Sequence, residues 1–408
     1  MQYPAMHRIR QTFPADSIQD IEGAVRQQMA ARAFPISSGA RVAVAVGSRG
    51  IHNIQPIVKT VVTCLKEMDF NPFIIPGMGS HGGATADGQI GVLEDMGISQ
   101  ATVGVPVVSS MEVVSLGKLE SGYNVLFAKD AMEADGVFAI NRVKPHTLFR
   151  RPVESGLCKM LVIGCGKHKG AESIHAFGVA DAIEPAAGII IEKAPILGGL
   201  AVLENALGGT QALELAMPEE FIQVDRKLLQ EAWKFFPKLP IKMLDLLIID
   251  EIGKNISGGG MDPNITGHWR RDGGDRDPDY RFIIVLDLTQ PSHGNAIGIG
   301  WADLTTKRLM DKIDLHAMHM NAITAGVFRA ARLPIALDTD RAVIDTALGK
   351  VPDPIYSRVA RIKNTLELET FWASAALVSE LKETGGLSAS ETPSDMVFDA
   401  KGLLLPFK

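Results

Sequence analysis

Apolar and polar positions follow a strand–helix rhythm over the first half of the chain. The apolar run "RVAVAVGSR" (41–49) has the composition of a strand that is covered on both faces. Residues 54–69 then carry apolar side chains at helical spacing, and 87–97 predicts a further helix. Apolar runs at 71–78 and 135–143 predict two more buried strands. This alternation predicts an α/β fold with a mostly parallel sheet and helices on its faces.

The pattern changes after about residue 198. Two apolar runs around the glycines at 208–209 predict a hairpin, and 218–236 predicts a helix whose first turn is acidic. The two prolines of the following "PKLPIK" indicate a domain boundary. We therefore predict a Rossmann-like domain at residues 1–237 and a smaller α/β domain at 238–408. The C-terminal tail can return to the first domain.

The second half begins with predicted strands at 243–253 and 281–288. Helical patterns run across 304–331 and 353–382. Between the two strands, residues 257–279 are rich in glycine and charge. We expect that segment to be a long loop that is too polar to pack.

Composition narrows the class of protein. Of the 408 residues, 46% are hydrophobic and 22% charged, which is ordinary for a soluble globular chain. The net charge of −6 and the scattered basic residues argue against a nucleic-acid or membrane partner. Three cysteines do not make a disulfide framework, and the N-terminus lacks the apolar segment of a signal peptide. We expect a cytoplasmic protein with a small-molecule partner; whether it forms a homo-oligomer stays open.

Three polar segments follow predicted strands: "GSRGIH", "GMGSHGG" and "RVKPHT". Ligands of open α/β sheets bind outside the carboxyl ends of the strands. Each segment contains a histidine, and the first also contains Arg49. A turn that needs positive φ explains the glycines of the second segment as well as a functional role does. A turn does not, however, require the imidazole of His81. In the third, a proline fixes the approach to His146.

The next segment is rich in metal-binding residue types. Cys158, Cys165, His168 and His175 have a spacing that fits a structural zinc site poorly, and Cys158 is expected to pack as a small hydrophobe. Lys159 stands in the apolar run "GLCKMLVIG". Its ammonium either reaches water or has a specific role, since a lysine in an apolar pocket becomes a usable nucleophile or covalent anchor.

Five of these residues, in this order, resemble the nickel-dependent lactate racemase family: Arg49, His81, His146, Lys159 and His175. That family has a "TRP"-type arginine loop, a "GTHR"-type histidine loop, "PH", an anchor lysine, and a histidine sixteen residues after it. Here the lysine and the last histidine are also sixteen apart. The chain departs from the family with "SRGIH" and with "TLFRRPVESGLC", which is longer than the family's stretch. We therefore expect a divergent branch with its own substrate.

The resemblance implies a cofactor and a role for each residue. A nickel-pincer nucleotide would be bonded to Lys159, and His175 would be the nickel ligand that the protein supplies. His81 and His146 would act as the general acid/base pair on either side of the substrate. Arg49 would bind the substrate carboxylate.

A racemase or epimerase of a 2-hydroxyacid is the function that we predict, with the active site in a cleft between the two domains. Lys254, in a glycine-containing segment after a predicted strand, would contact the nucleotide phosphate. One alternative is a lyase or dehydrogenase-like enzyme that uses the same site without nickel. Another is a binding protein that handles a cofactor or ligand and catalyses nothing.

Overall fold

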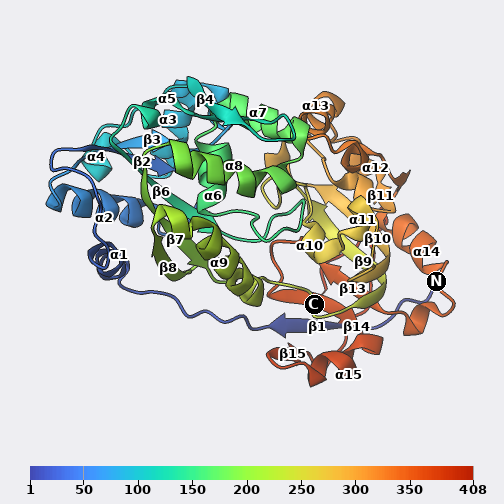
Figure 1. Ribbon diagram of the computed structural model, residues 1–408. Helices are drawn as coiled ribbons and strands as arrows, with labels where there is room; N and C mark the ends of the chain where they lie inside the picture. The colour runs from blue at the N-terminus through green and yellow to red at the C-terminus, as the bar shows by residue number, and fades with distance from the viewer. Residues whose placement is uncertain (49, 408) are drawn as a thin grey trace. The chain divides into compact units, whose positions relative to one another are not determined.

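The chain folds into two compact α/β units, as the alternating pattern predicts. The computed structural model describes residues 1–407 except Arg49, and the side chains of residues 175–177 and Thr324 are also outside the described part. One unit comprises residues 14–236, and the other joins residues 1–13 to 237–408 (Figure 1). The predicted first domain began at residue 1. The first thirteen residues instead belong to the second unit, because their strand pairs in its sheet.

A five-stranded sheet in the order β3-β2-β6-β7-β8 forms the middle of the unit 14–236. Its first four strands are parallel and β8 is antiparallel to β7, which gives the hairpin expected at 208–209. The bounds are β2 (Arg41–Val46), β3 (Asn71–Pro76), β6 (Gly136–Val143), β7 (Ile196–Glu204) and β8 (Thr210–Ala216).

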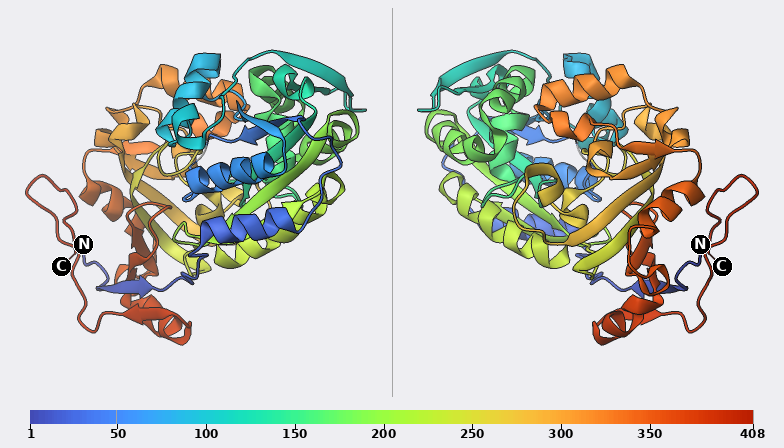
Figure 2. Two further views of the ribbon diagram at one scale, coloured as in Figure 1. Left: turned by 90° about the vertical axis from the view of Figure 1, so that its left-hand side faces the viewer. Right: turned by 90° about the vertical axis from the view of Figure 1, so that its right-hand side faces the viewer.

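Helices cover both faces of this sheet and bury a separate core on each. Val42, Val44 and Val46 of β2 lie in the core that helices α1, α2 and α3 also line, and Ala43 and Ala45 lie in the opposite core. Figure 2 shows α1 and α2, in blue, side by side in its left view. On the first face are α1 (Ile21–Ala30), α2 (Ile54–Glu67) and α3 (Ala86–Asp95). On the second are α6 (Leu157–Lys159), the π-helix η2 (Met160–Gly164), α7 (Lys167–Phe177), α8 (Val179–Lys193) and α9 (Phe221–Phe235).

An eight-stranded mixed sheet forms the second unit, in the order β12-β11-β10-β9-β13-β14-β1-β15. The predicted strands at 243–253 and 281–288 are its parallel neighbours β9 and β10. The bounds are β9 (Met243–Ile252), β10 (Asp279–Leu288), β11 (Leu304–Thr306), β12 (Ile335–Leu337), β13 (Val359–Ile362), β14 (Thr370–Ser374), β1 (Met6–Gln11) and β15 (Leu387–Ala389). No helix in the described part of the chain is long and apolar enough to cross a membrane.

The prediction of long helices across 304–331 and 353–382 was wrong in part. The stretch 304–331 starts with β11 and then holds α12 (Lys307–Met310) and α13 (Leu315–Ala325). The stretch 353–382 contains the strands β13 and β14 before α15 (Ala375–Glu383). Short apolar runs fit a helix or a strand equally well, and here pairing with β9, β10 and β1 decides for the strand.

The prediction that 257–279 is too polar to pack was also wrong. The short helix α10 (Pro263–Thr266) is buried along its whole length. The backbone packs closely because glycines leave room: a Cβ on Gly260 would overlap the carbonyl of Ile297. The side chain of Arg270 is 7% exposed, and its guanidinium lies 2.9 Å from the Asp303 carboxylate. Glycines that allow close backbone packing, together with an ion pair, thus allow the polar segment 257–279 to pack against the rest of its unit.

Candidate active site

The order of the strands brings the first two predicted loops into contact. Because β3, β2 and β6 are parallel neighbours, the segments after them leave the same edge of the sheet. Ser48, two residues beyond β2, has its Oγ 2.5 Å from Nδ1 of His81, which follows β3. Arg49 lies outside the described residues. His81 is exposed at this edge.

A buried carboxylate ties the first loop to the end of β6. Glu204, at the end of β7, accepts a hydrogen bond of 2.7 Å from the backbone N–H of His52. Its other oxygen pairs with the guanidinium of Arg142 on β6. The side chains of both partners of this pair are largely buried, which makes the contact stronger than a surface ion pair. The loop after β2 is therefore held by His81, which follows β3, and by Glu204 at the end of β7.

His146 is held in one orientation by its own segment. Its backbone N–H donates to Glu154 Oε2 at 2.7 Å, and Glu154 also accepts from the N–H of Arg151 at 3.0 Å. Glu154 is 2% exposed, and burial raises the pKa of its carboxyl group. Phe149 stacks on the imidazole with ring centroids 4.1 Å apart. Residues 149–154 are thus what positions this histidine.

The hydrogen bonds of His146 also decide which ring nitrogen carries the proton. The backbone N–H of Leu148 donates to Nδ1 at 3.1 Å. An amide N–H can only donate, so Nδ1 accepts, and the neutral ring carries its proton on Nε2. His81 differs, because its Nδ1 faces a hydroxyl that can donate or accept. The neutral His146 ring is therefore a hydrogen-bond donor at Nε2, whereas Nδ1 of His81 can donate or accept.

Lys159 stands at the end of a tight turn that a buried aspartate supports. Asp225 on α9 is 1% exposed and accepts from the N–H groups of Leu157 and Cys158 at 2.9 and 2.8 Å. Burial raises the pKa of Asp225 to about 7. Gly156 has a φ of +89°, and a Cβ there would overlap the Asp225 carboxylate. Lys159 itself is half-buried and is followed at once by the π-helix η2, a feature that often marks functional sites.

Close backbone packing joins this turn to the loops at the sheet edge. A Cβ on Gly77 would overlap the side chain of Met160, the residue after Lys159. The N–H of Gly79 donates to the carbonyl of Gly164 at 3.1 Å. Gly79, Gly82 and Gly83 have positive φ, as the turn considered from sequence requires, and Gly77 also allows a close approach that the sequence analysis did not consider.

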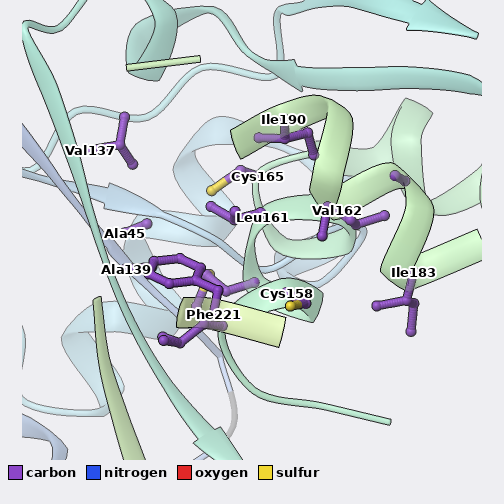
Figure 3. Packing of buried hydrophobic residues seen from close by; sticks show 14 of the residues in the cluster. Ala45, Val137, Ala139, Cys158, Leu161, Val162, Cys165, Ile183, Ile190 and Phe221 are labelled. Atoms are coloured by element: carbon purple, nitrogen blue, oxygen red, sulfur yellow. The ribbon is translucent and has the colours of Figure 1, made fainter. Parts of the chain in front are cut away.

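The two cysteines lie in the core. Cys158 and Cys165 are free and 0% exposed, and Figure 3 shows them among apolar side chains such as Leu161 and Phe221. The prediction that Cys158 packs as a small hydrophobe is confirmed. No group of three or more metal-ligating side chains occurs among the described residues. Position 175 lies on α7, but the side chain of His175 is outside the described part.

Lys254 belongs to the other unit, where its side chain forms hydrogen bonds with neighbouring residues. Its Nζ donates to the carbonyl of Gly258 at 2.7 Å and to Asn321 Oδ1 at 2.9 Å. These bonds join the segment after β9 to α13. Its contact with a nucleotide phosphate stays a prediction, as does the placement of the site in a cleft between the domains.

Sequence reasoning missed the residues that hold the candidate site in place. Ser48, Glu154, Glu204 and Asp225 were not singled out. A signal existed for Asp225, because it stands on the same helical face as Phe221 and Leu228, where a core residue is expected. No comparable signal existed for Glu154, whose partners depend on the path of the loop.

Comparisons with known proteins support the fold. No protein-family model matches the sequence, and neither does any curated protein. The chain is similar in structure to the lactate racemase apoprotein from Thermoanaerobacterium thermosaccharolyticum, with a TM-score of 0.54 and 14% identity over 88% of this chain and 99% of that one. It is also similar to a structural-genomics protein from Thermotoga maritima, with a TM-score of 0.52 and 14% identity over 78% and 84%. The chain therefore has a fold like that of lactate racemase.

Proposed function

We propose that this protein is a racemase or epimerase of a 2-hydroxyacid. The observation that carries the proposal is the meeting of three features in one unit: the loop with His81, the oriented ring of His146, and the turn with Lys159. The loop with His81 is hydrogen-bonded through Gly79 to Gly164 of the π-helix that follows Lys159, and the segment with His146 leaves the same edge of the sheet. The likeness in fold to a lactate racemase apoprotein supports the same conclusion.

The residues present fit a nickel-pincer nucleotide. Such a cofactor holds nickel through three of its own atoms, so a square-planar site needs only one protein ligand. A cluster of three metal-ligating side chains is therefore not required. Lys159 would carry the covalent bond on a turn that Asp225 holds rigid. His175 would supply the ligand. When bound, the cofactor would accept the hydride of the substrate α-carbon and return it.

The protein's own groups would bind the substrate and move its hydroxyl proton. Arg49 would pair with the carboxylate in a charge-assisted contact. His81 would take the hydroxyl proton, since its Nδ1 contact with Ser48 suits either protonation state of the ring. His146 would donate a hydrogen bond from Nε2 to a substrate oxygen. Lys254 would bind the nucleotide phosphate.

Mass and metal analysis of protein produced in a host that builds the cofactor tests the proposal. We expect an added mass on the peptide that contains Lys159, about one nickel per chain, and interconversion of hydroxyacid enantiomers by chiral chromatography. Lys159→Ala should lose the added mass and the activity while it keeps the fold. Unmodified, nickel-free protein that converts no hydroxyacid under these conditions would contradict the proposal. Turnover without nickel would favour the lyase or dehydrogenase-like alternative.

A further inference from the structure

Lys167 is a buried lysine that the proposed reaction does not use. It is 1% exposed, and it is the only lysine that is buried among the described residues. No carboxylate of the described part lies within ion-pair distance of its ammonium. Its φ of +55° is in the left-handed region, which residues other than glycine rarely adopt. Both features cost free energy, and such costs often accompany a functional constraint.

The contacts of Lys167 lead to the His81 loop. Its Nζ donates to the carbonyl of Pro76, the last residue of β3, at 2.7 Å. It also donates to Oε1 of Gln89 at 3.2 Å. Gln89 on α3 is 0% exposed, and its Nε2 donates to the carbonyl of Gly79 at 2.9 Å and more weakly to that of His81 at 3.4 Å.

We infer that Lys167 and Gln89 form a buried relay that positions His81 for catalysis. The ammonium fixes the side-chain amide of Gln89 by occupying its oxygen, so both amide N–H groups point at the loop carbonyls. The same lysine starts α7, the helix that carries position 175. The relay thus ties the loop of the acid/base histidine to the helix of the nickel ligand. This inference rests on the proposed function for the role of His81, but the relay itself does not.

The state of Lys167 matches this role. Burial lowers the pKa of its ammonium, and the two oxygen acceptors offset part of the lost hydration. Replacing Lys167 would leave Pro76 and Gln89 without their donor, and such a variant can fail to fold. Gln89→Glu is the sharper change, because it is isosteric and keeps an oxygen for Lys167. It replaces the donor to Gly79 and His81 with an oxygen that cannot donate, and it gives Lys167 a carboxylate partner.

Hydrogen exchange and kinetics of Gln89→Glu test the relay. We expect amide exchange across 79–85 to become about three- to tenfold faster, while β2 keeps its wild-type rates and the thermal midpoint changes little. In cofactor-loaded enzyme, kcat should fall about tenfold with KM nearly unchanged. The matched control is Gln28→Glu, because Gln28 accepts from the N–H of Leu215 at 2.9 Å through its oxygen and its amide N–H groups have no hydrogen bond to another described residue. That variant should behave as wild type.

Each other outcome overturns the inference or the proposed function, and the two are distinguishable. Wild-type exchange in 79–85 would overturn the relay. Faster exchange throughout the unit, or faster loop exchange with an unchanged kcat, would reduce Gln89 to a structural residue and overturn the positioning role. If wild-type protein converts no hydroxyacid, the proposed function fails, while the exchange data still decide whether Gln89 holds the loop.

Discussion

Individual carboxylates do most of the positioning at the candidate site. Glu154, Glu204 and Asp225 each accept from the backbone N–H of a segment that carries a predicted functional residue. A buried carboxylate has two oxygens and accepts more than one N–H, so it can hold an irregular segment that no helix or sheet would satisfy. Irregular backbone near a ligand site therefore requires buried acids behind it.

Asp225 should give the protein a pH-dependent stability. Its pKa in the folded state is raised to about 7, from an ordinary value near 4, so the folded state binds its proton more tightly. The unfolding free energy should therefore fall, relative to that of Asp225→Asn, as the pH rises from about 4 to about 7, and it should level off above. Urea unfolding of both proteins across this range measures the difference. If the unfolding free energies of the two proteins changed with pH in parallel, the raised pKa of Asp225 would be contradicted.

At the scale of the element, the turn before Lys159 depends on two unlike constraints. Gly156 must adopt positive φ, and Asp225 must fit where a Cβ would stand. The amide of Asn141 donates to the carbonyl of Gly156 at 2.6 Å from the side of β6. The turn is therefore held by the sheet and by α9 together, so Lys159 can remain half-buried in an apolar surrounding.

Gly156→Ala should disrupt this turn. The added methyl strains a positive φ and displaces the carboxylate that accepts from Leu157 and Cys158, so we expect a loss of about 3 kcal/mol in unfolding free energy. Attachment of the cofactor to Lys159 should fall as well. Urea unfolding and intact mass measure the two effects.

The matched control for this change is Gly188→Ala. Gly188 lies inside α8 with no atom near the place of a Cβ. Alanine is favoured over glycine in a helix, so we expect a gain of up to about 1 kcal/mol. Equal effects of the two substitutions would mean that the turn is not a constrained element.

At the scale of the whole molecule, the first thirteen residues complete a sheet whose other strands come from the second half of the chain. β1 pairs with β14 over five residue pairs and with β15 over three. Met6 and Ile9 are 0% exposed. The cores of the unit 14–236 contain no side chain from this segment. The stability of one unit therefore depends on the distant N-terminus, and that of the other does not.

A chain that begins at residue 14 should show this difference. Loss of β1 removes three buried side chains, those of Met6, Ile9 and Gln11, and leaves β14 and β15 without their neighbour. The unit 237–408 should therefore unfold about 10 °C or more below its wild-type midpoint. The unit 14–236 should keep its transition. Calorimetry and limited proteolysis measure both, and a chain that begins at Tyr3 is the control, since Met1 and Gln2 are exposed. A uniform loss in both units would contradict the division.

The sequence by itself determined the α/β class, the parallel strands of the first half, and the edge at which the loops with His81 and His146 emerge. Those features follow from local periodicity and from the rule that carboxyl ends of parallel strands share an edge. Tertiary structure alone decided that β13 and β14 are strands, that β1 joins the second unit, and that Glu154, Asp225 and Gln89 lie behind the site. Strand pairing and the burial of a polar group depend on partners far away in the chain. The periodicity of apolar residues is local and does not identify those partners.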